Sequence, residues 1–155
     1  MTLDELAQLL VQATEDFEAE ASHWRFAFRG VPMLCLCDPG FDRMRFIAPV
    51  VELVELDEAT KDALLEANFH STLDARYCSS GALLFSAFIH PLSSLDASLA
   101  RSALDQVASL VETFGTHFSS GALEFVSGSE DELDLDDEDY EGFEDEDEDE
   151  GPLLN

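Results

Sequence analysis

Residues 24–48 read WRFAFRGVPMLCLCDPGFDRMRFIA and contain three short apolar runs. The runs are Trp24–Arg29, Met33–Cys37 and Arg43–Ala48. In the first and third, large apolar side chains alternate with arginines, which is the period of a strand with one buried face. Gly30–Pro32 provides the first turn. In Asp38–Phe41, Pro39 and Gly40 occupy the two central positions, as in a type II turn. We therefore predict an antiparallel three-stranded meander, which Pro49 ends or confines to a sheet edge.

Helical patterns precede and follow this meander. Thr2 and Glu5 have the spacing of a capping box. Apolar residues follow at intervals of three and four, namely Leu3, Leu6, Leu10, Ala13 and Phe17. Asp57 is placed to cap a second helix that runs to about Phe69 and has a partly exposed apolar stripe. Both segments are predicted to be amphipathic helices.

A hairpin and a third helix complete the predicted fold. Ala75–Cys78 and Leu83–His90 read as two strands, and the second is apolar on both faces, so it should lie centrally or under a partner. Ser93 or Ser94 is expected to cap the third helix, and Gly115 or a neighbour to end it. Its apolar stripe is Leu95, Leu99, Ala103, Val107, Leu110 and Phe114. The element order α-β-β-β-α-β-β-α predicts an α+β fold with helices packed on an antiparallel sheet.

A step in charge near Gly128 divides the chain. Residues 1–128 hold all 7 Lys and Arg together with 19 of the 35 acidic residues, whereas residues 129–155 hold 16 acidic residues and no base. No packed core could neutralise that run. We predict one folded domain over residues 1–128 and a disordered acidic tail over residues 129–155. Residues 116–128 could be a short strand or the start of the tail.

Charge and cysteine content restrict the class of protein. The net charge of −28 disfavours direct binding to nucleic acid or to anionic lipid. No secretory signal or membrane span is evident, and three cysteines are an odd number that argues against a disulfide framework. We therefore expect a cytoplasmic protein without membrane contact, in which Cys35 and Cys37 share one face of a strand as reduced thiols.

Several short segments resemble a known family. Residues 64–69 read LLEANF, residues 75–77 read ARY, residues 83–92 end in His-Pro-Leu, and Ser94 with Leu95 opens the last helix. In this order they resemble the YbjN family over roughly residues 2–115. That family shares the fold of type III secretion chaperones of the Tir-chaperone kind. The resemblance implies a small acidic homodimer that binds extended segments of a partner protein without ATP and without catalysis.

No pattern in the sequence predicts an enzyme, a metal site or a cofactor. His23, His70, His90 and His117 lack the short ligand spacings of structural zinc. The sequence contains no nucleophile-elbow motif for serine and no motif of an activated cysteine. A catalytic pair that no motif marks, such as Asp74 with His90, stays an open alternative. The acidic run lacks EF-hand spacing, so stoichiometric calcium binding is not predicted.

Two sets of residues are candidates for binding a partner. Leu84 and Phe88 carry surplus apolar surface that a two-fold dimer could cover. Four arginines alternate with buried side chains on two strands and could form one face: Arg25, Arg29, Arg43 and Arg45. That face could be a solvated surface with acidic cross-strand partners, an anion site, or a surface that the tail folds back on and masks.

The tail itself offers a second functional hypothesis. It interleaves acidic residues with Leu133, Leu135, Tyr140 and Phe143, a composition typical of segments that solubilise a protein or bind basic partners. Our leading hypothesis is a non-catalytic, chaperone-like or regulatory homodimer that binds segments of a partner protein. The alternative is a charge mimic or acidic chaperone whose tail captures basic proteins.

Overall fold

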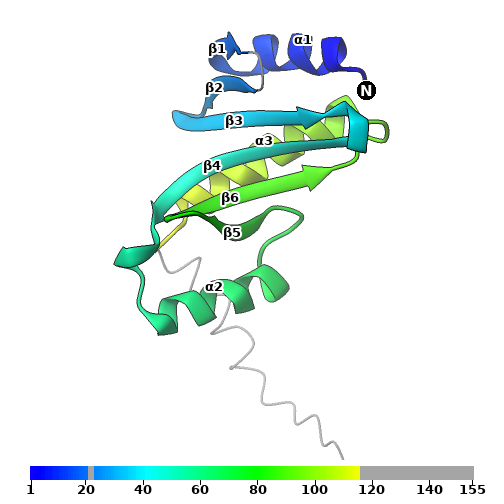
Figure 1. Ribbon diagram of the computed structural model, residues 1–155. Coiled ribbons are helices and arrows are strands. Elements are labelled where there is room, and N and C mark those ends of the chain that lie inside the picture. Colours follow the sequence, from blue (N-terminus) through cyan, green and yellow to red (C-terminus); the bar gives the residue numbers. More distant parts are fainter. Residues whose placement is uncertain (21–22, 116–155) are drawn as a thin grey trace, which may run out of the picture.

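The computed structural model describes residues 1–20 and 23–115, which form a six-stranded sheet with helices packed on it (Figure 1). The elements in chain order are α1 (Leu3–Ala13), β1 (Glu15–Ala19), β2 (Trp24–Phe28), β3 (Val31–Asp38), the 3-10 turn η1 (Pro39–Phe41), β4 (Arg43–Glu52), the 3-10 turn η2 (Leu53–Glu55), α2 (Glu58–His70), β5 (Arg76–Ser80), β6 (Leu83–His90) and α3 (Ala97–Glu112). The strand order is β1-β2-β3-β4-β6-β5, and all neighbours are antiparallel. The predicted α+β fold is confirmed, with β1 as an additional strand.

Helix α1 begins with the predicted capping box. The Thr2 hydroxyl accepts a hydrogen bond from the Glu5 amide at 3.2 Å, and the Glu5 carboxylate accepts one from the Thr2 amide at 2.7 Å. This exchange satisfies two amides that the first helical turn would leave without partners. The helix then buries Leu6, Leu9 and Leu10 against the sheet.

Strand β1 replaces the end of the predicted first helix. The helix stops at Ala13, and the backbone of Thr14 is already extended. Phe17, expected on the helical stripe, lies in β1 with its ring centroid 6.0 Å from that of Trp24 in β2. Because β1 contains one large apolar residue, it has no period-two pattern by which it could be recognised.

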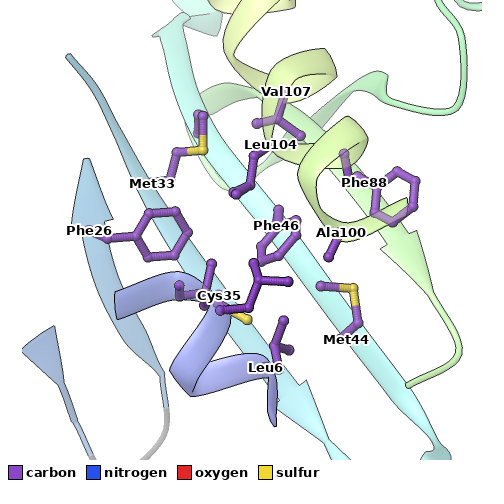
Figure 2. Packing of buried hydrophobic residues seen from close by; sticks show 14 of the residues in the cluster. Leu6, Phe26, Met33, Cys35, Met44, Phe46, Phe88, Ala100, Leu104 and Val107 are labelled. Carbon is purple, nitrogen blue, oxygen red and sulfur yellow. The ribbon is translucent and has the colours of Figure 1, made fainter. Parts of the chain in front are cut away.

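Helices α1 and α3 enclose the main core on one face of the sheet (Figure 2). Phe46 of the central strand β4 is fully buried and meets the ring of Phe26 edge-on at a centroid distance of 6.1 Å. The buried side chains of α3 are mostly small: Ala100, Ala103, Leu104, Val107 and Ala108. Because these side chains are small, the helix lies close to β4 and β6 and the core between them is tightly packed.

Two turns of the meander differ from the sequence prediction. The loop between β2 and β3 consists of Arg29 and Gly30, whose φ angles of 55° and 76° are those of a type I′ turn. After β3 the chain forms a 3-10 turn in place of the predicted type II turn. The Asp38 carboxylate accepts from the Phe41 amide at 3.3 Å, and Asp42 adopts the left-handed conformation (φ 50°).

Strand β4 passes through Pro49 and continues to Glu52 in the middle of the sheet, between β3 and β6. The pairing with β6 shifts in register between Pro49 and Val51. A bulge therefore accommodates the proline, which has no amide hydrogen to donate. Pro49 does not end the strand, but it does end regular pairing, as predicted: the pairs with β3 reach only to Ile47, and the register with β6 shifts after Pro49.

Helix α3 is capped by Asp96, not by Ser93 or Ser94 as predicted. The Asp96 carboxylate accepts from the Leu99 amide at 2.8 Å. Ser93 belongs to the preceding loop, where its amide and hydroxyl both donate to Asp42, at 2.7 and 2.6 Å. These two bonds join the β3–β4 connection to the loop that leads into α3.

The Asp42 contact makes stability depend on pH. The hydrogen bonds from Ser93 hold the pKa of Asp42 below its ordinary value. A carboxyl whose pKa is lower in the folded state stabilises the fold above its unfolded pKa, and that contribution is lost as the pH falls through the folded value. We expect Asp42→Asn, which tolerates the left-handed backbone, to lower the unfolding temperature at pH 7. The difference from wild type should shrink towards pH 2–3, near or below an ordinary aspartate pKa of about 3.9.

Thermal unfolding at several pH values checks this expectation. The matched control is Asp62→Asn, an exposed carboxyl on α2 that has no hydrogen bond or ion pair within the described residues. A wild-type advantage over Asp42→Asn that stays constant from pH 7 to pH 2 would contradict it.

Candidate partner-binding surface

The face of the sheet opposite α1 and α3 is not covered by any helix within residues 1–20 and 23–115; it faces the viewer in Figure 1, with α3 behind it. We call this surface the open face. Its apolar side chains come from the three central strands: Leu34, Leu36, Ile47, Phe85, Ala87 and Ile89. Ile89 is 57% exposed, an unusual degree for a large apolar residue in the interior of a sheet.

Strand register interleaves arginines with these apolar side chains. Arg45 stands between Leu36 on β3 and Ile89 on β6. One row across the sheet is Arg25, Leu34, Ile47, Ala87 and Arg76. The open face therefore has an apolar centre with cationic side chains within it and on both sides of it.

The three open-face arginines differ in what they contact. Arg25 forms an ion pair with Glu20 at 3.0 Å. The Arg76 guanidinium donates to Thr72 and to backbone carbonyls of the loop before β5. Arg45 is exposed and has no hydrogen bond or ion pair in the part of the chain that the structure describes. Arg45 is thus the cation most available to a ligand.

Of the remaining two predicted arginines, one lies at the end of the open face and one on the other side of the sheet. Arg43, at the start of β4, donates to the Asp42 carbonyl oxygen at 2.8 Å and lines the end of the open face. Arg29 lies in the β2–β3 turn and pairs with Asp105 at 3.5 Å and with Glu112 at 2.5 Å, both on α3. Arg29 therefore belongs to the helix-covered side, and the four arginines do not form a single face.

A hollow opens at the η1 end of the open face. It has a volume of about 490 Å³ and is lined by Leu36, Cys37, Asp38, Phe41, Arg43 and Arg45. Phe41 is 79% exposed at its rim. An apolar floor beside two guanidinium groups suits a side chain or peptide that is partly apolar and partly anionic.

Leu84 and Phe88 lie on the opposite side of β6 from the open face. They are 4% and 2% exposed and belong to the protein's own hydrophobic core. A partner could contact them only by displacing a helix. Alternation showed that β6 has two apolar faces, but the helices cover the Leu84 side and leave Phe85 and Ile89 on the open face.

Asn68 of α2 closes the edge of the sheet at β5. Its side-chain amide donates to the Tyr77 carbonyl oxygen at 2.9 Å and accepts from the Tyr77 amide at 2.7 Å. The side chain thereby takes the place of a neighbouring strand at Tyr77. Since an unpaired edge invites another strand, this contact hinders strand addition to β5 at Tyr77.

The described residues bring no catalytic group together. Asp74 is bonded to Gln106, and His90 Nδ1 lies 2.8 Å from the Pro91 carbonyl oxygen, with no hydrogen bond between Asp74 and His90. The Ser86 hydroxyl is fully buried and has no hydrogen-bond partner among these residues, so no base activates it.

The cysteines and histidines likewise form no metal-binding group of three or more within the described chain. The sulfurs of Cys35 and Cys37 are 3.6 Å apart, and both residues are free thiols. The hydrogen bond to Cys37 and burial raise the pKa of Cys35, which keeps this thiol protonated. His117 lies outside the described residues, as do residues 129–155. No described helix is long and apolar enough to cross a membrane.

These features define an α+β fold, an antiparallel sheet with one helix-covered and one open face. No family model and no curated protein matches the chain. Among solved structures, a chain of the ExsC–ExsE complex matches with a TM-score of 0.58 and 16% identity, over 74% of this chain and 94% of its own. A chain of the HopA1–SchA chaperone–effector complex matches with a TM-score of 0.52 and 8% identity, over 73% and 98%. The likeness agrees with the fold that the sequence resemblance implied.

Proposed function

We propose that this protein is a non-catalytic, chaperone-like or regulatory module that binds extended segments of a partner protein on its open face. The observation that carries the proposal is the interleaving of exposed arginine with an uncovered apolar strip across β3, β4 and β6. The similar chains come from protein complexes, one of them a chaperone–effector complex. That likeness supports a protein as the ligand.

The chemistry of the open face suits an extended segment with both apolar and acidic side chains. Such a segment can bury apolar side chains against Leu34, Ile47 and Ile89 while a carboxylate pairs with Arg45. Because Asn68 occupies the β5 edge at Tyr77, binding across the face is favoured over addition of a strand at this edge.

We further propose that the protein acts as a cytoplasmic homodimer. Helix α2 exposes Leu65 and Phe69, which are 68% and 83% exposed, beside an apolar groove of about 350 Å³ between α2, η2 and β5. A second copy related by a two-fold axis would cover this apolar surface. The free thiols fit a reducing compartment.

Residues 129–155 favour one alternative, because 16 acidic residues without a base attract basic proteins. In that case the acidic segment binds the partner and the folded domain, assigned to residues 1–128, serves only to hold it.

Site-specific photo-cross-linking in the full chain separates the two functions. A benzophenone amino acid is placed at Ile89 on the open face, at Val54 as a control, or at Leu135 in the acidic segment. Val54 is 85% exposed and lies on η2, away from the open-face rows. We expect Ile89 to cross-link discrete segments of a partner protein in cell extract, and Val54 to give several-fold less of the same product. Products from Leu135 alone, with basic proteins, would establish the alternative and overturn the proposal. Sedimentation of the purified chain reports whether its mass is that of one copy or two.

A further inference from the structure

The open face and residues 129–143 of the same chain have matching chemistry. The face combines the apolar side chains of Leu34, Ile47 and Ile89 with the guanidinium of Arg45, which has no partner within residues 1–20 and 23–115. Residues 129–143 read SEDELDLDDEDYEGF, in which leucine and aromatic residues alternate with carboxylates. Both the charge and the apolar content of this segment are complementary to the face.

Acidic side chains lie around the margins of the open face, so its positive charge is concentrated near the centre. Glu18 lies opposite Arg25, and Glu52 lies opposite Leu83 at the far end of β4. Asp38 lies opposite Arg43 beside the η1 hollow. Carboxylates of a ligand are therefore drawn to the middle of the sheet, where Arg45 stands between two apolar side chains.

The path of the chain allows the segment to reach this centre. Tyr77 of the edge strand β5 donates its hydroxyl to the Leu110 carbonyl oxygen at 2.7 Å, and its ring lies 6.2 Å from that of Phe114. The last described residue, Gly115, thus follows directly after a contact with the sheet edge. Seventeen residues separate it from Leu133, which is a reach of up to about 60 Å. Six strands at roughly 4.8 Å spacing span only about 24 Å.

We propose that residues 129–143 bind the open face of their own chain and occupy it until a partner segment displaces them. Leu133 and Leu135 cover the apolar strip, and an aromatic residue, Tyr140 or Phe143, enters the hollow beside Arg43 and Arg45. Apolar or acidic competitors then gain access to the face only by displacing this internal ligand. The competition with a partner rests on the proposed function, but occupation of the face by the segment does not.

The test uses the purified full chain without any partner, so its outcome is independent of the proposed function. A benzophenone amino acid replaces Leu135, which the proposal places on the apolar strip, and mass spectrometry maps the cross-links. An equal mixture of isotopically heavy and light chains distinguishes cross-links within one chain from those between copies. We expect intrachain products on peptides that contain Leu34, Ile47 or Ile89, and a fall of several-fold at 0.5 M salt, because exposed ion pairs are screened.

Two charge-reversal variants make the test specific. Removing the ion pair in Arg45→Gln is expected to reduce the open-face products about two- to fivefold, as for an exposed ion pair. Arg45→Glu adds repulsion and is expected to reduce them by at least about fivefold. Arg101→Glu is the matched control: this arginine is exposed on α3, on the other side of the sheet, and has no ion pair within the described residues. Equal loss in Arg101→Glu and Arg45→Glu would overturn the proposal. So would products located mainly on α1 or α3, or products that join heavy and light chains. Circular dichroism confirms that each variant is folded, and Arg45→Gln carries the test if Arg45→Glu is not.

Discussion

Replacing Phe46 by alanine is expected to lower the free energy of unfolding by about 3–5 kcal/mol. Phe46 is fully buried on β4, the strand between β3 and β6, and its ring packs edge-on against Phe26 under the small residues of α3. Truncation removes apolar surface from the centre of the core and leaves a cavity. The sheet and the closely packed helix α3 cannot move together to fill that cavity. For a domain whose total stability is of the order of 5–15 kcal/mol, this is a large fraction.

Denaturant unfolding of the full chain measures the effect. Phe41→Ala is the matched control, because it makes the same substitution at a side chain that is 79% exposed on η1. We expect a change of less than about 0.5 kcal/mol for that control. Comparable losses in the two variants would mean that Phe46 is not at the centre of the core.

The second large effect is expected at Asn68. Asn68→Ala removes both hydrogen bonds to the Tyr77 backbone and leaves an amide and a carbonyl without partners in a partly buried site. We expect a loss of about 1–3 kcal/mol in unfolding free energy. The backbone amide of Tyr77 should also exchange its hydrogen faster than in wild type. A general loss of stability would instead speed exchange throughout the domain, so a change confined to β5 identifies the local effect.

The consequences of Asn68→Ala extend to association. With the β5 edge unpaired at Tyr77, strands of other copies gain a place to pair, so the variant should form larger species in sedimentation. Glu66→Ala serves as the control, since Glu66 is exposed on the same helix and has no hydrogen bond or ion pair in the described residues. Unchanged exchange at Tyr77 in Asn68→Ala would contradict the role assigned to this side chain.

Several elements could be predicted because their signals are local. The capping box of Thr2 and Glu5 and the Asp57 cap of α2 depend on residues three apart, and the structure contains both. The strand Leu83–His90 was recognised with the bounds it has, and the predicted strand over residues 24–29 ends one residue earlier, at Phe28. In contrast, β1 forms because β2 offers it a partner, and neither the cap at Asp96 nor the bulge at Pro49 follows from propensity alone.

The candidate site was predicted only in part. Arg25, Arg43 and Arg45 were recognised as possible ligands because they alternate with buried side chains, and Arg25 and Arg45 lie on the open face, with Arg43 at its end. Arg29 was included by the same alternation, but it stands in a turn and pairs with α3. Asn68 was part of the segment that resembles the YbjN family, yet its contact with Tyr77 depends on how α2 packs beside β5.

Residue order thus determined most of the elements and the α+β class, because period and capping are properties of neighbouring residues. The charge pattern likewise predicts a separate acidic segment. Packing decided which side of each strand became the core. Strand β6 carries apolar residues on both faces, and nothing local distinguishes Leu84 and Phe88 from Phe85 and Ile89. The distinction arises because helices cover the first pair and leave the second pair on the open face, where Ile89 lies beside Arg45. Phe88 packs in the core under α1 and α3, and Leu84 packs with Leu64 of α2 and Leu110 of α3.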